Sequence, residues 1–290
     1  MDTAIKSTNG TQSFMNQSTA KERADRVDPY GFERSDDFDY ESYEELMSEY
    51  LVILTRRAIK WTRLLKVKRY VRKGIPNEHR ALIWMAASGA QDRLEKNPGY
   101  YQSMLLSHHD SKLVETIRTD LNRTFPDNIL FRKTSDQCLL KALYNVLLAY
   151  GHHNPSVGYC QGMNFVAGYL LIITKDEEKS FWLMDALIGR ILPDYYSPAM
   201  MGLKMDQEVL GELVKLKIPR VWQVMAEHNV MWTLVVSRWF ICLYIDILPV
   251  EAQSLPDICQ AFKQITQGPF VEDCHAFMQV RGGMHPVIAP

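Results

Sequence analysis

The sequence predicts an all-α fold, an irregular bundle of many helices packed around one core. In successive segments apolar residues recur at three- and four-residue steps, which is typical of amphipathic helices. No alternating apolar and polar pattern bounded by hairpin turns occurs, so strands are not predicted. Apolar residues make up 47% of the 290 residues and charged residues 23%, which fits a soluble globular protein.

The composition disfavours several classes of protein. The formal net charge is −1 and the isoelectric point is about 6.7, so nothing favours a nucleic-acid binder. The five cysteines are odd in number, scattered and without a CxxC pair, so neither a disulfide framework nor a zinc ribbon is predicted. We interpret the cysteines as reduced thiols of a cytoplasmic protein.

Neither a signal peptide nor a transmembrane segment is predicted, because the N-terminus is polar and no apolar run is long enough. The run at residues 165–174 is too short to cross a bilayer, and Arg238 and Asp246 interrupt the run at residues 230–248. We expect both runs to be core helices.

The chain begins with two segments outside the main domain. Residues 1–40 are predicted to be flexible, and the acidic, aromatic part after residue 28 either packs as an extended arm or binds a partner. Residues 41–71 are predicted to contain a long amphipathic helix, because apolar residues recur at helical steps from Tyr43 to Leu65. Basic residues from 56 to 73 form either a solvated face or a surface for an acidic membrane or GTPase.

The main domain, residues 72–279, is predicted to open with a turn at residues 74–76, where Pro76 begins a helix. That helix is predicted to bury three consecutive residues, Leu82, Ile83 and Trp84. A turn at residues 97–99 precedes a short helix at residues 100–106.

A charged pair lies in the stretch from Thr116 to Asn128, which is predicted to be an amphipathic helix. Its buried face carries residues four apart, Leu113, Ile117 and Leu121. Asp120 and Arg123 are expected to meet on one face of this helix, which Pro126 should end. An arginine braced in this way can be presented rigidly to a phosphate, although the pair alone also fits an ordinary surface ion pair.

A helix at residues 139–150 is followed by a predicted loop at residues 152–156, which contains two adjacent histidines. No carboxylate or cysteine lies at ligand spacing around them, so a loop histidine pair is favoured over a metal site. Cys160 also suggests a thiol nucleophile, but its neighbours match the motif around Gln161, described below, better than a protease signature. Further helices are predicted at residues 165–173, 177–191, 205–216, 219–227 and 230–248, with a loop at residues 193–202.

Two spaced motifs resemble the signatures of the TBC domain. They are Ile117-x-x-Asp120-x-x-Arg123-Thr124 and Tyr159-x-Gln161-Gly162-Met163. The likeness extends to Gly74-Ile75-Pro76 with Arg80 and Trp84, and to Ser237-Arg238-Trp239-Phe240 with the residues up to Pro249. It therefore covers roughly residues 72–249.

The resemblance implies a GTPase-activating protein for Rab-family small GTPases in their GTP-bound state. Arg123 would stabilise charge on the transferred phosphoryl group, Gln161 would orient the attacking water, and Asp120 would orient Arg123. Supporting roles fall to Tyr159, Thr124, Gly162 and Asn164. GTP and Mg²⁺ belong to the partner, so we expect no cofactor or metal of the chain's own, and it has no G-x-x-x-x-G-K-[ST] loop.

The sequence departs from the family pattern after Pro249, where an expected core helix is missing. We interpret the chain as internally shortened after about residue 250, with a loose tail at residues 280–290. Both catalytic motifs precede this point. A second hypothesis follows, in which the chain binds a Rab or acts as a scaffold with impaired catalysis because its core is incomplete.

Overall fold

The computed structural model describes residues 26–34, 38–41, 43–45, 48, 52, 75–135, 138–192, 194–245 and 247. Helices make up this part of the chain, with two isolated β-bridges and no strand among the residues it covers, so the all-α prediction is confirmed. In chain order the α-helices are α4 (Asn77–Ala87), α5 (Ala90–Lys96), α6 (Tyr100–Leu106), α7 (Ser111–Leu121), α8 (Leu140–His153), α9 (Met163–Thr174), α10 (Glu177–Ala186), α11 (Met201–Lys217), α12 (Pro219–Glu227) and α13 (Trp232–Ile241).

Two short helices complete the set, η1 (Ile129–Phe131), a 3₁₀ turn, and η2 (Leu187–Ile191), a π-helical extension of α10. No helix in the described ranges has the length and hydropathy needed to span a membrane. The predicted helix in residues 41–71, its basic run, the first residues of the chain and everything after residue 247 lie outside the described residues, apart from a few positions before residue 53.

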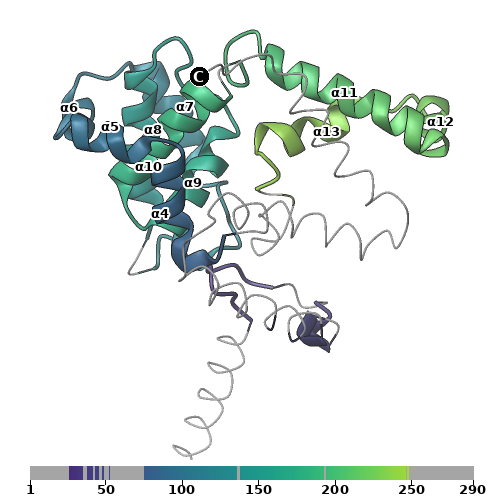
Figure 1. Cartoon of the computed structure of the whole chain (residues 1–290), viewed down its shortest axis with the longest axis horizontal. Helices are drawn as coiled ribbons and strands as arrows, with labels where there is room; N and C mark the ends of the chain where they lie inside the picture. Colours follow the sequence, from purple (N-terminus) through teal and green to yellow (C-terminus); the bar gives the residue numbers. More distant parts are fainter. Residues whose placement is uncertain are drawn as a thin grey trace, which may run out of the picture.

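Most of the core lies in the block of helices α4–α10, which gathers on one side of the molecule (Figure 1), and Leu203 of α11 and Val236 and Phe240 of α13 also belong to it. Helix α9 is its centre, because ten of its twelve residues are buried, from Met163 to Ile172. A helix that is apolar on all sides needs neighbours on all sides, and α8, α10, α7 and α4 pack around it. Each fully buried large apolar side chain stabilises the fold by about 1.5–3 kcal/mol.

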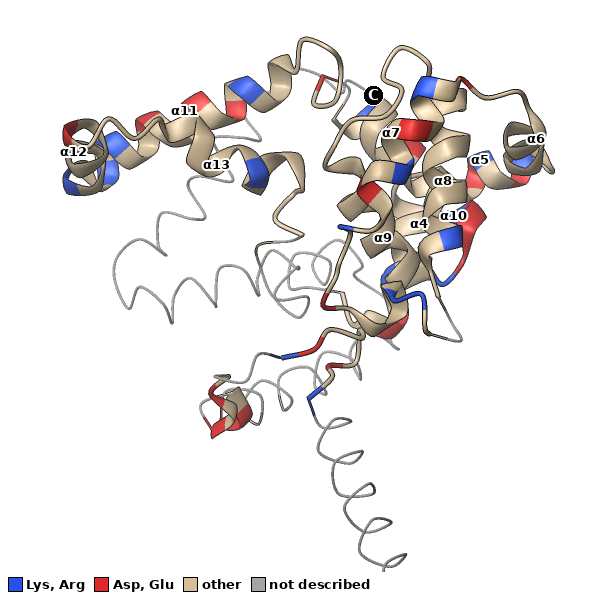
Figure 2. Ribbon diagram, turned by 180° about the vertical axis from the view of Figure 1, so that it is seen from behind, with Lys and Arg blue, Asp and Glu red and all other residues tan. Residues whose placement is uncertain are grey.

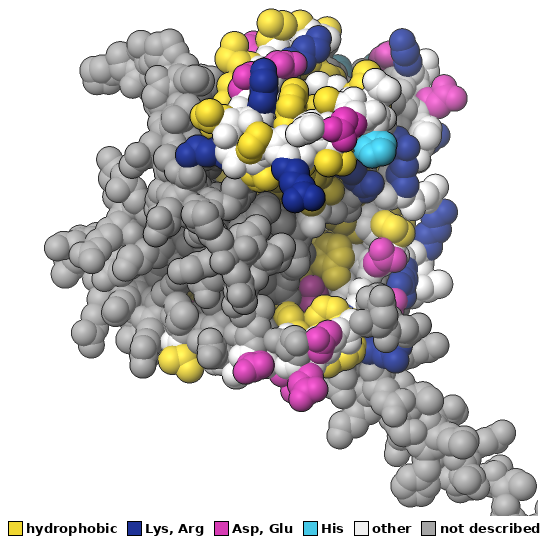
Figure 3. All heavy atoms as spheres, turned by 90° about the vertical axis from the view of Figure 1, so that its right-hand side faces the viewer, with side chains coloured by type: hydrophobic (Ala, Val, Ile, Leu, Met, Phe, Trp, Pro, Cys, Tyr) yellow, Lys and Arg dark blue, Asp and Glu magenta, His cyan; other side chains and the backbone are white. Residues whose placement is uncertain are grey.

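Helices α11–α13 form a second block that extends away from the first (Figure 1). Helix α12 has no buried residue, and α13 buries only Val236 and Phe240. Both basic and acidic side chains lie along α11 and α12 (Figure 2). Apolar side chains are exposed among the charged ones at this end of the molecule (Figure 3). The exposed set includes Met205, Leu216, Val221, Val224, Leu234 and Val235.

Residues 26–34 pack on the main domain as an arm, which is the first of the two alternatives open from the sequence. The amide of Ile129 donates to the carbonyl of Gly31 over 2.8 Å, and that of Glu33 donates to the carbonyl of Asp127 over 2.8 Å. Phe32 packs edge-on against Phe125, with ring centroids 5.2 Å apart. The arm therefore lies against the segment that follows Arg123.

Four local predictions are wrong. Leu82 of α4 is 69% exposed, because successive helical residues point about 100° apart and three in a row cannot share one buried face. The two histidines lie in the last turn of α8, and α11 begins at Met201 within the predicted loop. The helix predicted up to residue 248 ends at Ile241, because Leu243 and Tyr244 adopt left-handed backbone angles, φ of 51° and 62°.

Candidate functional site

Arg123 lies in a tight turn directly after α7. The helix ends at Leu121, five residues before the proline that was expected to end it. The amide of Arg123 donates to the carbonyl of Asp120 over 3.2 Å, and the Thr124 hydroxyl donates to the same carbonyl over 2.8 Å. A side-chain hydroxyl thus replaces the backbone donor that a continuing helix would supply, and the chain turns away from the helix axis.

Asp120 and Arg123 do meet, as predicted, although across this turn rather than along a helix. The guanidinium contacts the Asp120 carboxylate, and the two side chains differ sharply in exposure: 53% for Arg123 and 4% for Asp120. The buried carboxylate holds one end of the guanidinium in a charge-assisted contact, and the rest of the planar group faces outward.

Tyr159 holds the other oxygen of the same carboxylate. Its hydroxyl donates to Oδ2 of Asp120 over 2.5 Å. Burial, and then the hydrogen bond to Asp120, raises the pKa of Tyr159 far above the ordinary value for a tyrosine, so the phenol keeps its proton and stays a donor. With Arg123 on one oxygen and Tyr159 on the other, Asp120 is fixed from two sides.

A chain of buried hydrogen bonds connects this turn to residues 159–163, which contain Gln161 and are called the glutamine motif below. Asn164 donates to the Thr124 hydroxyl oxygen over 2.8 Å, and the amide of Gly162 donates to Oδ1 of Asn164 over 2.9 Å. Thr124 and Asn164 are 1% and 0% exposed. Because a buried amide side chain needs its partners, Asn164 fixes the distance between the two motifs.

Phe125 anchors the segment after Arg123 in the core. It adopts φ of 49°, a left-handed angle that is uncommon for a bulky residue, and it is buried against Phe131 and Phe165. A Cβ at Gly168 of α9 would lie 2.9 Å from the Phe125 ring, so glycine at that position leaves room for it. Packing therefore compensates for the backbone angle and sets the path of the turn.

Gln161 is exposed and lies just before α9. Gly162 caps that helix with φ of 107°, and a Cβ there would lie 3.0 Å from Cγ1 of Ile241 and 3.1 Å from its carbonyl oxygen. The end of α13 thus packs closely against Gly162 of the glutamine motif. The Tyr196 hydroxyl donates to the Ile241 carbonyl over 2.8 Å and holds this end in place.

The structure therefore brings together all seven predicted site residues. Six of them join in one hydrogen-bonded and ion-paired network: Asp120, Arg123, Thr124, Tyr159, Gly162 and Asn164. Gln161 is connected to it through the peptide bond to Gly162. Sequence reasoning missed Tyr196 and Ile241, because no local pattern connects positions 45 residues apart. The catalytic roles stay predictions.

The two other chemistries considered from the sequence gain no support. His153 is bound on both ring nitrogens by protein groups, the Tyr100 hydroxyl at 2.8 Å and the Asp185 carboxylate at 3.0 Å. The described residues contain no group of three or more His, Cys, Asp or Glu side chains that could hold a metal. Burial, and then the charge of Asp120, raises the pKa of the Cys160 thiol, which disfavours the reactive thiolate.

Arg123 and Gln161 are both exposed, next to the buried network. Comparison with known proteins identifies the family. The family model of the Rab-GTPase-TBC domain matches residues 77–255. The chain is 62% identical to growth hormone-regulated TBC protein 1-A of Danio rerio, over 90% of this chain and 86% of that protein. It is 58% identical to growth hormone-regulated TBC protein 1 of Homo sapiens, over 91% of both chains. Within the family the sequence also resembles the growth hormone-regulated TBC protein, and these two relatives confirm that resemblance.

Solved structures show a similar fold. The Chlamydomonas flagellar RabGAP TBC domain superposes with a TM-score of 0.65 at 30% identity, covering 84% of this chain and 83% of that one. The alignment to the Danio rerio protein runs over 306 positions, more than the 290 residues of this chain, so that relative contains residues without a counterpart here. This difference fits a shortened chain, and the place of the missing segment after Pro249 stays a prediction.

Proposed function

The chain belongs to the Rab-GTPase-TBC domain family, and we propose that it accelerates GTP hydrolysis on a Rab GTPase by supplying Arg123 and Gln161 in trans. The observation that carries this proposal is the network that ties both residues to one buried frame. Asp120 holds the guanidinium, and the hydrogen bonds of Thr124 and Asn164 reach the amide next to Gln161.

In this proposal Arg123 reaches the phosphates of GTP bound to the partner. Its outward-facing donors neutralise the charge that develops on the transferred phosphoryl group. An arginine supplied in trans in this way raises the rate by ~10³–10⁵. Asp120 and Tyr159 keep the guanidinium aimed, so little side-chain entropy is lost when the partner binds.

Gln161 orients the attacking water in the same proposal. Its side-chain amide both donates and accepts hydrogen bonds. It can therefore contact the oxygen and a proton of the water at the same time and direct the water oxygen toward the phosphorus. GTP and Mg²⁺ are bound by the GTPase, and this chain contributes neither. The partner is expected in its GTP-bound state, and the protein is expected in the cytoplasm, near membranes only through that partner.

A second candidate function is a Rab-binding or scaffold module with impaired catalysis. Two observations favour it: the Danio rerio relative has residues that this chain lacks, and the α11–α13 block leaves large apolar side chains exposed. If the support of Ile241 on Gly162 is loose, Gln161 is displaced from productive geometry while the binding surface remains.

Single-turnover GTP hydrolysis across a panel of purified Rab GTPases separates the two functions. The first predicts that at least one Rab hydrolyses GTP faster with the chain, in proportion to the amount added. The second predicts a Rab that is bound without acceleration and that the Danio rerio protein does accelerate. A panel in which no Rab is either bound or accelerated contradicts both.

A further inference from the structure

A shallow basic groove lies between the exposed face of α7 and the start of α8. It has a volume of about 460 Å³, and three cations line it: Arg118, Lys133 and Lys141. Asn122 and Tyr144 line it as well, together with two leucines. We refer to these residues as the α7–α8 groove. None of them belongs to the network around Asp120.

The three cations have no carboxylate partner within the part of the chain that the structure describes. All three side chains belong to exposed residues. Like charges that share one groove repel one another, and this repulsion is relieved when an acidic group enters. The groove is thus suited to carboxylates from another molecule.

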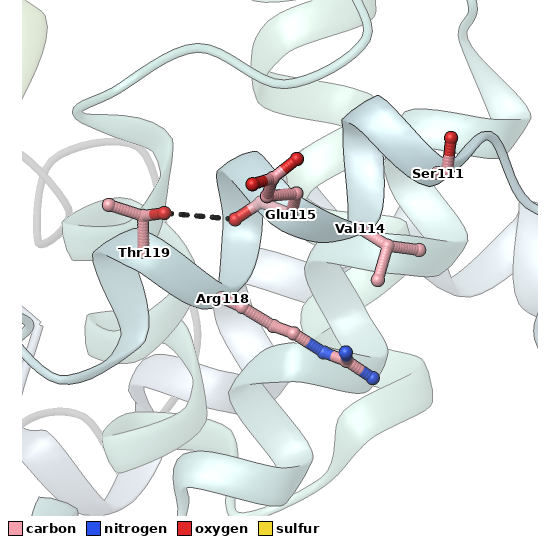
Figure 4. A pocket seen from close by; sticks show the side chains of 5 residues that line it. All are labelled: Ser111, Val114, Glu115, Arg118 and Thr119. Atoms are coloured by element: carbon pink, nitrogen blue, oxygen red, sulfur yellow. Dashed lines mark hydrogen bonds between the residues drawn. The ribbon is translucent and has the colours of Figure 1, made fainter.

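Arg118 is already positioned for such contacts. Its guanidinium lies over the ring of Tyr144, 5.8 Å from the centroid, in a cation–π contact. In Figure 4 its side chain extends from α7 toward the neighbouring helix, away from Ser111 and Thr119. A guanidinium held over a ring loses less freedom on binding than a free one.

The place of the groove indicates which molecule enters it. Asn122 lines the groove, and Arg123 is the next residue along the chain. A protein that presents its nucleotide to Arg123 would therefore come close to this groove. We propose that the α7–α8 groove binds an acidic segment of the GTPase, and so helps to determine which GTPase is accepted. The inference rests on the proposed function.

The test reverses the three charges together, with Arg118→Glu, Lys133→Glu and Lys141→Glu in one variant of the full chain. The matched control makes the same change in net charge at three exposed lysines elsewhere, Lys96→Glu, Lys112→Glu and Lys204→Glu. A milder variant with glutamine at the three groove positions covers the case in which the reversal disturbs folding, which circular dichroism reports. The GTPase that responds best in the panel is the probe.

We expect the groove variant to raise KM for that GTPase at least about tenfold while kcat at saturation stays within a factor of about two. Its kcat/KM should also lose the fall with rising salt that we expect of the wild type, because repelling charges have replaced attracting ones and salt screens the repulsion. The control should show a much smaller rise in KM. The glutamine variant should lie between the wild type and the reversal.

Three results overturn the proposal. One is a KM equal to that of the control variant, and another is a loss of kcat with KM unchanged, which would place these residues in the chemistry. The third is unchanged GTPase kinetics with lost binding to vesicles of phosphatidylcholine and phosphatidylserine, which would assign the groove to a membrane. Failure of the proposed function gives a different result: the wild type itself then neither binds nor accelerates any Rab. Failure of the groove proposal alone leaves the wild type active and appears only in the variants.

Discussion

The arginine loop, residues 122–128, and the glutamine loop, residues 157–162, are connected by hydrogen bonds but are held in different ways. Side chains hold the arginine loop: Asp120 contacts the guanidinium, Tyr159 fixes Asp120, and Phe125 is buried against α9. The glutamine loop depends in addition on its backbone at Gly162, whose amide donates to Asn164, whose φ of 107° caps α9, and which packs against the end of α13.

This difference shows which part of the molecule each loop needs in order to keep its position. The supports of Arg123 lie in the densely buried block α4–α10, together with the arm at residues 26–34. The glutamine loop depends in addition on Ile241, which belongs to the sparsely buried block α11–α13. A defect in the C-terminal part of the chain should therefore impair the contribution of Gln161 before that of Arg123.

The largest expected effect is that of Arg123→Lys. Lysine keeps the charge but loses the planar, five-donor group that can contact Asp120 and phosphate together. We expect stimulated hydrolysis to fall by at least ~10³-fold, measured as kcat/KM in single-turnover assays, with an unchanged circular dichroism spectrum. Arg132→Lys is the matched control, because Arg132 also pairs with a carboxylate, that of Glu33. Retention of most activity by the Arg123 variant would refute the role of this residue.

Gln161→Ala should have the second largest effect. Removing one positioned polar group from a transition state costs about 10²–10³-fold in rate, and the exposed side chain contributes little to stability. The same assay measures the loss, and a melting curve should match that of the wild type. Gln223→Ala, at an exposed glutamine of α12, serves as the control. Normal activity of the Gln161 variant would mean that the water is positioned by the partner.

Asn164→Ala tests the connection between the loops. The change leaves the Gly162 amide without its acceptor and removes the donor to the Thr124 hydroxyl oxygen, which costs about 1–3 kcal/mol of unfolding free energy and lowers Tm by about 2–12 °C. With both loops less fixed, we expect kcat/KM to fall about 10²-fold. Asn145→Ala, which removes an amide bonded to Glu177 away from the site, is the control. Equal activities of the two variants would show that Asn164 has no positioning role.

Ile241→Ala should have the smallest effect and should act through Gln161 alone. Truncation removes the contact with Gly162 and lowers kcat/KM about tenfold. A double-mutant cycle provides the measurement, because the effect of Ile241→Ala should disappear when Gln161 is already alanine. The same loss in both backgrounds would show a general defect in folding instead.

Local patterns predicted much of the fold because helix faces follow from spacing. Residues 100–106 form α6 as expected, and Ile117 lies fully buried on the face that the four-residue spacing indicated. The end of α7 at Leu121 was missed, since it is set by the Thr124 hydroxyl and by the burial of Phe125, neither of which changes the local periodicity. The end of α13 was also missed, because the apolar pattern continues past Ile241 although the backbone turns at Leu243 and Tyr244.

The candidate site was predictable from its two motifs, but its connections were not. Spacing placed Asp120 beside Arg123, and the family resemblance added Gln161. The bonds from Tyr159 to Asp120 and from Asn164 to Thr124 join positions about 40 residues apart, so only the packing of α7 against α9 brings them together. The support of Ile241 on Gly162 depends likewise on tertiary structure.

The central claim is that both catalytic groups come from this chain, and a Rab whose own catalytic glutamine is replaced by alanine tests it most directly. Single-turnover hydrolysis by that Rab is measured with the wild-type chain and with Gln161→Ala. We predict that the wild-type chain still accelerates hydrolysis strongly, because Gln161 positions the water, and that Gln161→Ala does not. Loss of acceleration with the altered Rab, together with normal acceleration of the unaltered Rab by Gln161→Ala, would contradict the account.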